Sequence, residues 1–174
     1  MKSLILICLA YILMSEGCQK KPVVDAIGLP PPTQIGANTF GALINGQVFI
    51  PQRKFGENGS PISLSYFATG PYIGLTLVAT DTKNSPYYLI TFHSSSALVE
   101  GQTYPLQATG ANVISTGFTS AAGNYTIAPP MSGQLTITKL DLANNIISGT
   151  FFFSAIDANN NKMDVADGRF DVKI

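Results

Sequence analysis

From Asn38 to the C-terminus, the chain is a succession of short β-rich runs separated by Gly, Asn, Asp and Pro. No stretch of useful length repeats its apolar residues at the helical period of about 3.6. Short strands without helices build antiparallel sandwiches or barrels, so we predict an all-β domain over 38–174, an antiparallel β-sandwich or barrel of about 8–10 short strands. The pattern leaves the choice between the two open. The expected strands are Thr39–Ile44, Gln47–Ile50, Ile62–Ala68, Tyr72–Thr80, Tyr87–His93, Asn112–Thr119, Asn124–Ala128, Gln134–Leu140, Ile146–Ile156 and Lys162–Ile174.

The final run, Lys162–Ile174, also indicates which of its side chains are buried. Its apolar residues occupy odd positions first and even positions later. A strand cannot change phase without an extra residue, so we predict a β-bulge near Asp167-Gly168. With that bulge, Phe170 and Val172 face the core. The charged side chains of the opposite face should point to solvent: Arg169, Asp171 and Lys173.

The N-terminus has the features of an export signal. A short positive start, Met1-Lys2-Ser3, precedes the unbroken apolar run Leu4–Met14. That run is about 11 residues long, whereas a helix needs roughly 20 to span a bilayer. We therefore predict a signal peptide over 1–17 that is removed in the mature protein.

The apolar run is followed by Gly17-Cys18, which resembles the lipobox of bacterial lipoproteins. The resemblance implies that diacylglycerol is attached to the Cys18 thiol and that cleavage falls just before it. Ser15 stands where most lipoboxes carry Leu, and Cys8 would be discarded with the signal peptide. Cys18 is then the single cysteine of the mature chain, and an exported protein with one thiol calls for an explanation, which acylation supplies. The alternative is a secreted protein that is cut near Gly17 and carries a free thiol.

Between the lipobox and the first strand lies a proline-rich segment. The stretch 18–37 has no sustained apolar period and contains Pro22 and the triplet Pro30-Pro31-Pro32. Successive prolines favour an extended polyproline II conformation. We therefore predict that Cys18 and the residues up to Ala37 form a lipidated tether that holds the β domain away from a bilayer.

Both ends of the β domain carry short motifs that resemble one family. The motifs are Asn38-Thr39-Phe40-Gly41-Ala42, Asn45-Gly46 and Pro51 at the start, and Leu135–Lys139, Ile147–Phe151 and Asp167–Asp171 at the end. Together with the lipobox and the tether, they resemble small uncharacterised lipoproteins of Bacteroidota. The resemblance implies an envelope location and an all-β fold, and it brings no known activity.

The charge balance argues against one class of partner. Ten Lys and Arg residues match ten Asp and Glu residues, whereas a nucleic-acid-binding surface needs a basic excess to neutralise phosphates. Charged residues are 11% of the chain, against about 25% in a typical domain. The polarity comes from Ser, Thr, Asn and Gln instead, which predicts an uncharged polar domain that binds no nucleic acid.

The motifs of common enzyme sites are missing from the sequence. There is no G-x-S-x-G and no H-E-x-x-H motif, which would mark a hydrolase nucleophile or a zinc site. The single histidine, His93, could meet Ser94–Ser96 in space, but we expect it to be a solvent-facing side chain that closes a strand. We expect no catalytic residue, no cofactor and no enzymatic activity.

A second candidate site begins at Asp157. Asp157-Ala158-Asn159-Asn160-Asn161 resembles the start of a calcium loop, in which alternate oxygens surround the cation. Lys162 stands where an EF-hand requires Gly, and Gly168 stands where it needs Glu. Because Asn and Asp also dominate ordinary turns, we predict a plain turn over Asp157–Asp164 and no metal site.

Aromatic residues offer a candidate binding surface. Tyrosine rings could stack on sugars, although core packing explains most of them equally well. The candidates are Tyr66, Tyr72, Tyr87, Tyr104 and Tyr125.

Taken together, these features predict a lipid-anchored protein of the cell envelope, held in a membrane by the diacylglycerol on Cys18. Gln19-Lys20-Lys21 lacks acidic residues; acidic residues at this place are associated with surface export in Bacteroidota, so we expect the periplasmic face of the outer membrane. Three functional classes stay open: a structural module or one that binds an envelope protein, a module that binds a glycan or a small hydrophobic ligand, and, third, an enzyme.

Overall fold

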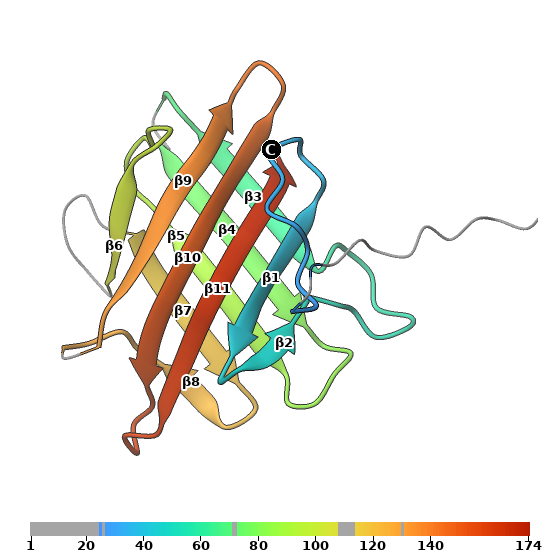
Figure 1. The fold of residues 1–174 in the computed structure, drawn as a ribbon, viewed down its shortest axis with the longest axis vertical. Coiled ribbons are helices and arrows are strands. Elements are labelled where there is room, and N and C mark those ends of the chain that lie inside the picture. The colour runs from blue at the N-terminus through green and yellow to red at the C-terminus, as the bar shows by residue number, and fades with distance from the viewer. Residues whose placement is uncertain (1–24, 26, 71–72, 108–113, 130) are drawn as a thin grey trace, which may run out of the picture.

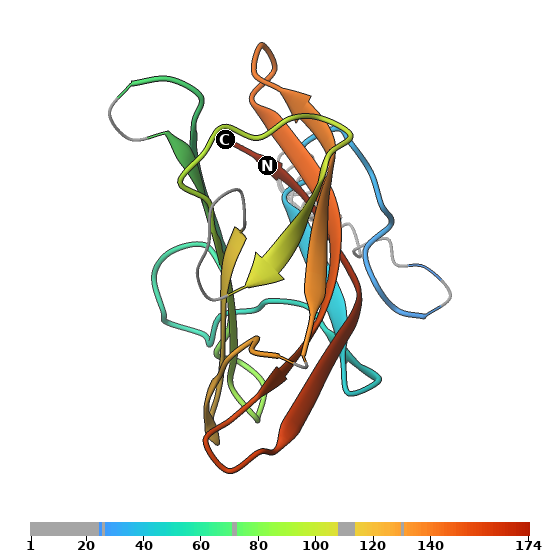
Figure 2. The ribbon, with the colours of Figure 1, turned by 90° about the vertical axis from the view of Figure 1, so that its left-hand side faces the viewer.

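The computed structural model describes residues 25, 27–70, 73–107, 114–129 and 131–174, and within these residues it contains strands and no helix. The strands form a single curled sheet, most of it antiparallel, whose two halves face each other as a half-barrel (Figures 1 and 2). The all-β prediction is confirmed. The strands are β1 (Thr39–Ile44), β2 (Gln47–Phe49), β3 (Ile62–Phe67), β4 (Gly74–Asp81), β5 (Tyr88–His93), β6 (Thr103–Gln107), β7 (Ile114–Ser120), β8 (Gly123–Tyr125), β9 (Gly133–Asp141), β10 (Ile146–Ile156) and β11 (Lys162–Lys173).

The order of the strands explains how one sheet makes two layers. Neighbouring strands follow the order β2-β1-β11-β10-β9-β6-β7-β5-β4-β3, and β8 pairs with β7. Strand β6 joins the halves, because Tyr104 pairs antiparallel with Leu135 of β9, whereas Leu106 pairs parallel with Ile114 of β7. In Figure 2, the layer of β9, β10, β11 and β1 lies opposite the layer of β3, β4, β5 and β7. We call these the front layer and the back layer.

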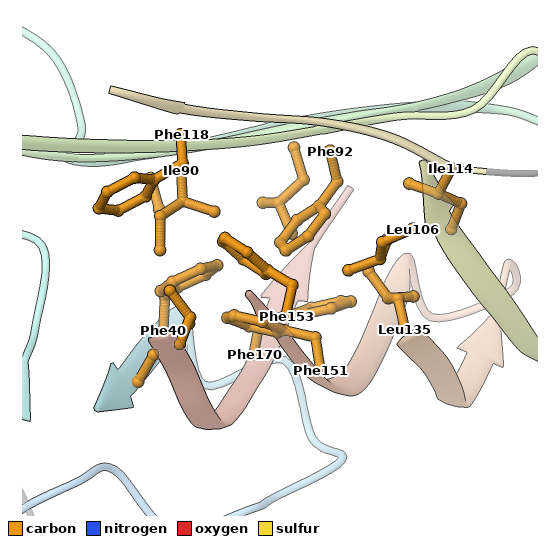
Figure 3. Close-up of a cluster of buried hydrophobic side chains, with 14 of the residues drawn as sticks. Phe40, Ile90, Phe92, Leu106, Ile114, Phe118, Leu135, Phe151, Phe153 and Phe170 are labelled. Carbon is orange, nitrogen blue, oxygen red and sulfur yellow. The ribbon is translucent and has the colours of Figure 1, made fainter. Parts of the chain in front are cut away.

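The space between the layers is filled by aromatic and aliphatic side chains (Figure 3). Phe92 from the back layer meets Phe151 from the front layer with ring centroids 4.9 Å apart, and Phe118 meets Phe153 at 6.1 Å. Aromatic pairs at such separations add to the stabilisation that comes from burying their area. Ile90, like these rings, has no more than a few per cent of its surface exposed.

The predicted bulge in the final strand is confirmed. Along β10, Phe151 pairs with Gly168 but Phe153 pairs with Val165, so β11 contains an extra residue at this point. Asp167 adopts a φ of 51° there, a left-handed conformation that Asp and Asn tolerate better than most residues. A Cβ atom at Gly168 would lie only 2.3 Å from the Phe151 ring. Beyond the bulge, Phe170 and Val172 are buried, as predicted.

The prediction for the opposite face of β11 is wrong at two of its three charged residues. Lys173 is exposed, but Arg169 is half-buried and Asp171 is 1% exposed. The cause is a segment that precedes β1 and lies across the outer face of the front layer (Figure 1). We call this segment, residues 25 and 27–37, the strap.

The strap also changes the expected tether. Leu29 is fully buried, and Pro30 packs so closely on β1 that a Cβ atom at Gly41 would lie 2.6 Å from its ring. The C-terminal part of the segment predicted to be a free tether is therefore part of the domain. The predicted signal peptide, Cys18 and the residues up to Val24 lie outside the described residues.

Candidate functional site

The outer faces of the two layers differ, and the difference defines the candidate site. The strap covers only the part of the front layer around Arg169 and Asp171, and other outward side chains of that layer, such as Phe152, are exposed. The outward side chains of the back layer are exposed or half-buried, apart from Thr80. Among them, the single titratable group is the imidazole of His93. We call this surface the open face. Its outward side chains are Ser63, Ser65, Phe67, Thr76, Val78, Leu89, Thr91, His93, Ser115 and Thr119.

One end of the open face is hollowed into a depression of about 640 Å³. Cross-strand register places Ser65 beside Thr76, Thr76 beside His93, and His93 beside Ser115. The hydroxyl of Thr76 lies 3.2 Å from His93 Nδ1. Phe67 flanks this polar row and is 57% exposed.

The wall of the depression depends on one glycine. Gly74, at the start of β4, has a φ of 139°, and a Cβ atom there would lie 1.9 Å from the carbonyl oxygen of Ser94. Only glycine allows this approach. It lets Leu75 and Ser94 exchange two backbone hydrogen bonds of 3.2 and 2.8 Å, which fix the segment after His93 against β4.

The depression offers hydrogen-bonding groups without formal charge beside apolar surface. Hydroxyl groups both donate and accept, and a neutral imidazole does the same through its two nitrogens. The exposed Phe67 and Ile73 supply the apolar part. This combination suits an uncharged ligand or a partner surface with both polar and apolar groups.

His93 is exposed, as predicted, at the end of β5. The neighbouring Ser94 is buried, and its hydroxyl donates to the carbonyl oxygen of Ser96 at 2.7 Å. A nucleophilic serine needs its hydroxyl next to a base, and this hydroxyl serves the local turn instead.

The tyrosines that could have stacked on sugars are placed differently. Tyr66, Tyr104 and Tyr125 are buried in the core, so the interpretation as a stacking surface is wrong for them. The hydroxyls of the first two accept hydrogen bonds from the backbone N–H groups of Leu98 and Val99 at 3.0 and 2.9 Å. Tyr87 is half-buried, and Tyr72 lies outside the described residues.

The aromatic residue that the depression does expose, Phe67, was not among the candidates. Its signal was present, because Phe67 follows Tyr66 in the same strand and must point to the opposite face. The alternation identifies two opposite faces, but it does not say which of two adjacent aromatic residues is the buried one.

The turn that begins at Asp157 uses its carboxylate internally. Oδ1 accepts from the N–H groups of Asn159 and Asn161, and Oδ2 accepts from the Asn161 side chain, each at 2.8 Å. The Asn161 side-chain hydrogen bond is the main cause that holds the pKa of Asp157 below its usual value. The turn closes at Asn161, and β11 begins at Lys162, so the turn is shorter than the predicted segment Asp157–Asp164. Within the described residues, no three His, Cys, Asp or Glu side chains come together as they would to hold a metal ion.

On the front layer, the strap is held by a buried carboxylate. Asp171 accepts hydrogen bonds from the Thr33 hydroxyl at 2.6 Å and from the backbone N–H groups of Ile35, Gly36 and Ala37 at 2.8–3.1 Å. The Ser148 hydroxyl donates a fifth at 2.8 Å. Burial raises the pKa of Asp171, but these hydrogen bonds outweigh burial and hold the pKa below its usual value.

A second ionic contact holds the beginning of the strap. Arg169 Nη2 lies 2.6 Å from Asp25 Oδ2, and both side chains are largely shielded from water. The carboxylate of Asp25 also accepts from the N–H groups of Ile27 and Leu29, which closes a turn there. The strap is therefore fixed at both ends: Asp171 holds its C-terminal end, and the ion pair between Asp25 and Arg169 holds its start.

Comparisons of the chain with protein-family models, curated proteins and solved structures find no match. In the described part of the chain, no helix is both long and apolar enough to cross a bilayer. The site is therefore interpreted from its geometry alone.

Proposed function

We propose that this protein is a lipid-anchored component of the cell envelope, on the periplasmic face of the outer membrane, and that its open face binds another envelope protein. The observation that carries the proposal is the difference between the two outer faces. The strap occupies part of the front layer, whose remaining outer surface carries charged side chains such as Lys162 and Asp164. The back layer exposes a polar, uncharged surface with Phe67 at its edge.

The strap indicates which layer of the domain is joined to the lipid-bearing segment. It connects the front layer to the segment that carries Cys18, so the lipid lies on the strap side of the domain. The back layer lies on the far side of the core from the strap (Figure 2). A membrane-anchored domain built in this way turns its open face towards the periplasm.

The composition of the open face supports a protein partner. The centres of protein interfaces are depleted in charged residues and enriched in aromatic residues, because burying an unpaired charge is costly. Phe67 is the kind of exposed ring that fills a pocket on a partner and carries much of the binding energy. Threonine and serine hydroxyls around it can form hydrogen bonds at little desolvation cost.

The depression supports a second candidate function, the binding of a neutral glycan. Ser65, Thr76 and His93 provide hydrogen-bonding groups beside the ring of Phe67, and sugars combine hydroxyl groups with an apolar C–H face. We do not propose an enzyme, because the Ser94 hydroxyl is committed to its turn.

Lipid attachment is tested by metabolic labelling with a palmitate analogue. The wild-type chain should be labelled and Cys18→Ser should not be. Equal labelling of the two would refute the anchor.

Partner binding is tested by placing a photo-crosslinking amino acid at Ser65 on the open face and, as a control, at Thr150 on the front layer. In cells, we expect a discrete cross-linked complex from Ser65 only. Phe67→Ala should abolish it, and the matched variant Phe152→Ala, an exposed phenylalanine of the front layer, should not. Identical cross-linking from both positions would refute the proposed role of the open face.

A further inference from the structure

The loop between β2 and β3 exposes the most accessible apolar side chain described. Phe55 is fully exposed, and every residue from Lys54 to Ser60 is exposed around it. Two cations, Arg53 and Lys54, come directly before the phenylalanine. Phe55 contributes nothing to the core, so its ring is free to contact a surface outside the domain.

The loop is held in place at its base. The backbone N–H of Lys54 donates to the Thr82 hydroxyl at 3.2 Å, and the N–H of Thr82 donates to the carbonyl oxygen of Gln52 at 2.8 Å. The same hydroxyl donates to Glu57, and Arg53 donates to the carbonyl oxygen of Ser60 at 3.2 Å. The end of β4 thereby supports the loop, and Phe55 stands at the end of a braced structure.

The loop leaves the sheet at the edge where the strap begins. Strand β2 is the end of the front layer, and a Cβ atom at Gly28 of the strap would lie 3.4 Å from Val48 of β2. The N–H of Gly28 donates to the carbonyl oxygen of Asp25 at 3.0 Å, so the start of the strap is also at this edge. Ile27 and Val48 are each about half exposed here. The loop and the strap share one lateral side of the molecule in Figure 1, but Figure 2 shows the strap outside the front layer and the loop on the side of the back layer.

The length of the connecting chain limits the distance to the lipid. Cys18 precedes Asp25 by seven residues, and a fully extended chain spans at most about 25 Å over seven residues. The start of the strap and the neighbouring strand β2, from which the Phe55 loop departs, are therefore held near whatever surface holds the lipid. Lys20 and Lys21 lie in the same short connection.

We propose that Phe55, together with the exposed Lys54, contacts the bilayer in which the Cys18 lipid is embedded. This inference rests on the proposed lipid anchor. Aromatic rings favour the boundary between headgroups and acyl chains, and adjacent basic residues favour anionic headgroups. The lipid supplies attachment, and the loop adds a second contact that fixes the orientation of the domain on the bilayer.

The chain has no tryptophan, so Phe55→Trp creates a single fluorescent reporter at the proposed contact. The matched control is Phe67→Trp, which replaces an exposed phenylalanine of the open face. Both variants are prepared as the full lipidated chain and reconstituted into phosphatidylethanolamine and phosphatidylglycerol vesicles. Some of the vesicles contain lipids brominated along the acyl chain, which quench tryptophan on contact.

The Phe55→Trp emission should shift to shorter wavelength and be quenched about twofold or more, because an interfacial side chain lies near the boundary of the acyl chains. Phe67→Trp should keep the emission of a solvated indole. In the Phe55→Trp background, Lys54→Gln should reduce the quenching when phosphatidylglycerol is present; Arg53 is left in place because it braces the loop through Ser60 and Glu57.

Vesicle flotation distinguishes a failure of the membrane contact from a failure of the lipid anchor. If the protein floats with the vesicles but the Phe55→Trp emission is quenched no more than that of Phe67→Trp, the membrane contact is refuted and the lipid anchor stands. A blue shift without quenching means that the ring is buried against protein, which also refutes the contact. If the lipid-dependent flotation itself is absent, both the anchor and this inference fall.

Discussion

Replacing Asp171 with asparagine tests how the domain holds its strap. Asp171 Oδ2 accepts from three donors and Oδ1 accepts from two. An amide nitrogen in place of either oxygen faces donors and cannot accept from them. If the amide nitrogen replaces Oδ2, the N–H groups of Ile35 and Ala37 lose their acceptor. If it replaces Oδ1, the N–H of Gly36 loses its acceptor. The hydroxyls of Thr33 and Ser148 can rotate and accept from the amide instead.

The magnitude follows from these counts. Each buried donor that loses its acceptor costs about 1–3 kcal/mol, and a hydrogen bond to a charged acceptor contributes about 1 kcal/mol more than a neutral one. We therefore expect Asp171→Asn to lower the free energy of unfolding by about 3–5 kcal/mol.

Denaturant titration of the purified protein measures this change, and hydrogen exchange locates it. Asp167→Asn is the matched control, since Asp167 is an exposed residue of the same strand and asparagine tolerates its left-handed conformation. We expect the control to stay within about 0.5 kcal/mol of wild type. Amide exchange should accelerate at Ile35, Gly36 and Ala37 in Asp171→Asn alone. A loss under about 1 kcal/mol with unchanged exchange would refute the argument.

The carboxylate of Asp171 also makes the stability of the folded domain depend on pH. The pKa of Asp171 is lower in the folded protein than its usual value, and that of an unfolded Asp is about 3.9. Its contribution is thus fully present above the unfolded pKa and is lost as the pH falls through the folded pKa. Asp171→Asn should reduce the slope of stability against pH below about pH 4, and an unchanged slope would contradict this sign.

Three further predictions concern packing and the Asp157 turn. Phe170→Ala should lower the free energy of unfolding by about 3–5 kcal/mol, whereas Phe152→Ala, on the exposed face of β10, should change it by less than about 1 kcal/mol; equal losses in denaturant titrations would show that the strand faces are wrongly assigned. Gly168→Ala should be strongly destabilising in thermal melts, because its Cβ would overlap the Phe151 ring, and a wild-type melting temperature would show that the bulge relaxes freely. Millimolar calcium should leave the melting temperature unchanged, since a ligand stabilises only the state that it binds; a rise that Asp157→Ala abolishes would reveal a metal site.

The strands were largely predictable because their alternation and turn residues are local. Asn45-Gly46 joins β1 and β2 as expected, and both residues have positive φ values of 48° and 79°. The phase change in the final run was enough to locate the bulge. Strand β6 was missed because Pro105 interrupts a short run, and proline within a run argues against a strand. It occurs here where the chain crosses from one layer to the other.

The burial of individual side chains on each face of the sheet was less predictable than the positions of the strands. A charged side chain that alternates with core residues normally points to water. That rule failed at Asp171, because residues of the strap that precede it by 134 to 138 positions in the sequence cover it. No local pattern around Asp171 indicates a distant segment. The same limit applies to the depression, whose lining comes from β3, β4 and the segment after β5. Composition predicted an uncharged surface, but only the fold shows that this surface is gathered on one layer.

The place of β11 gives one strand two structural roles. It lies between β1 and β10 in the front layer, and it carries Asp171, which accepts the hydrogen bonds of the strap. A copy without this strand would leave β1 and β10 with unpaired edges and give the strap no acceptor to dock on. The integrity of the front layer and the docking of the strap therefore depend on the same strand.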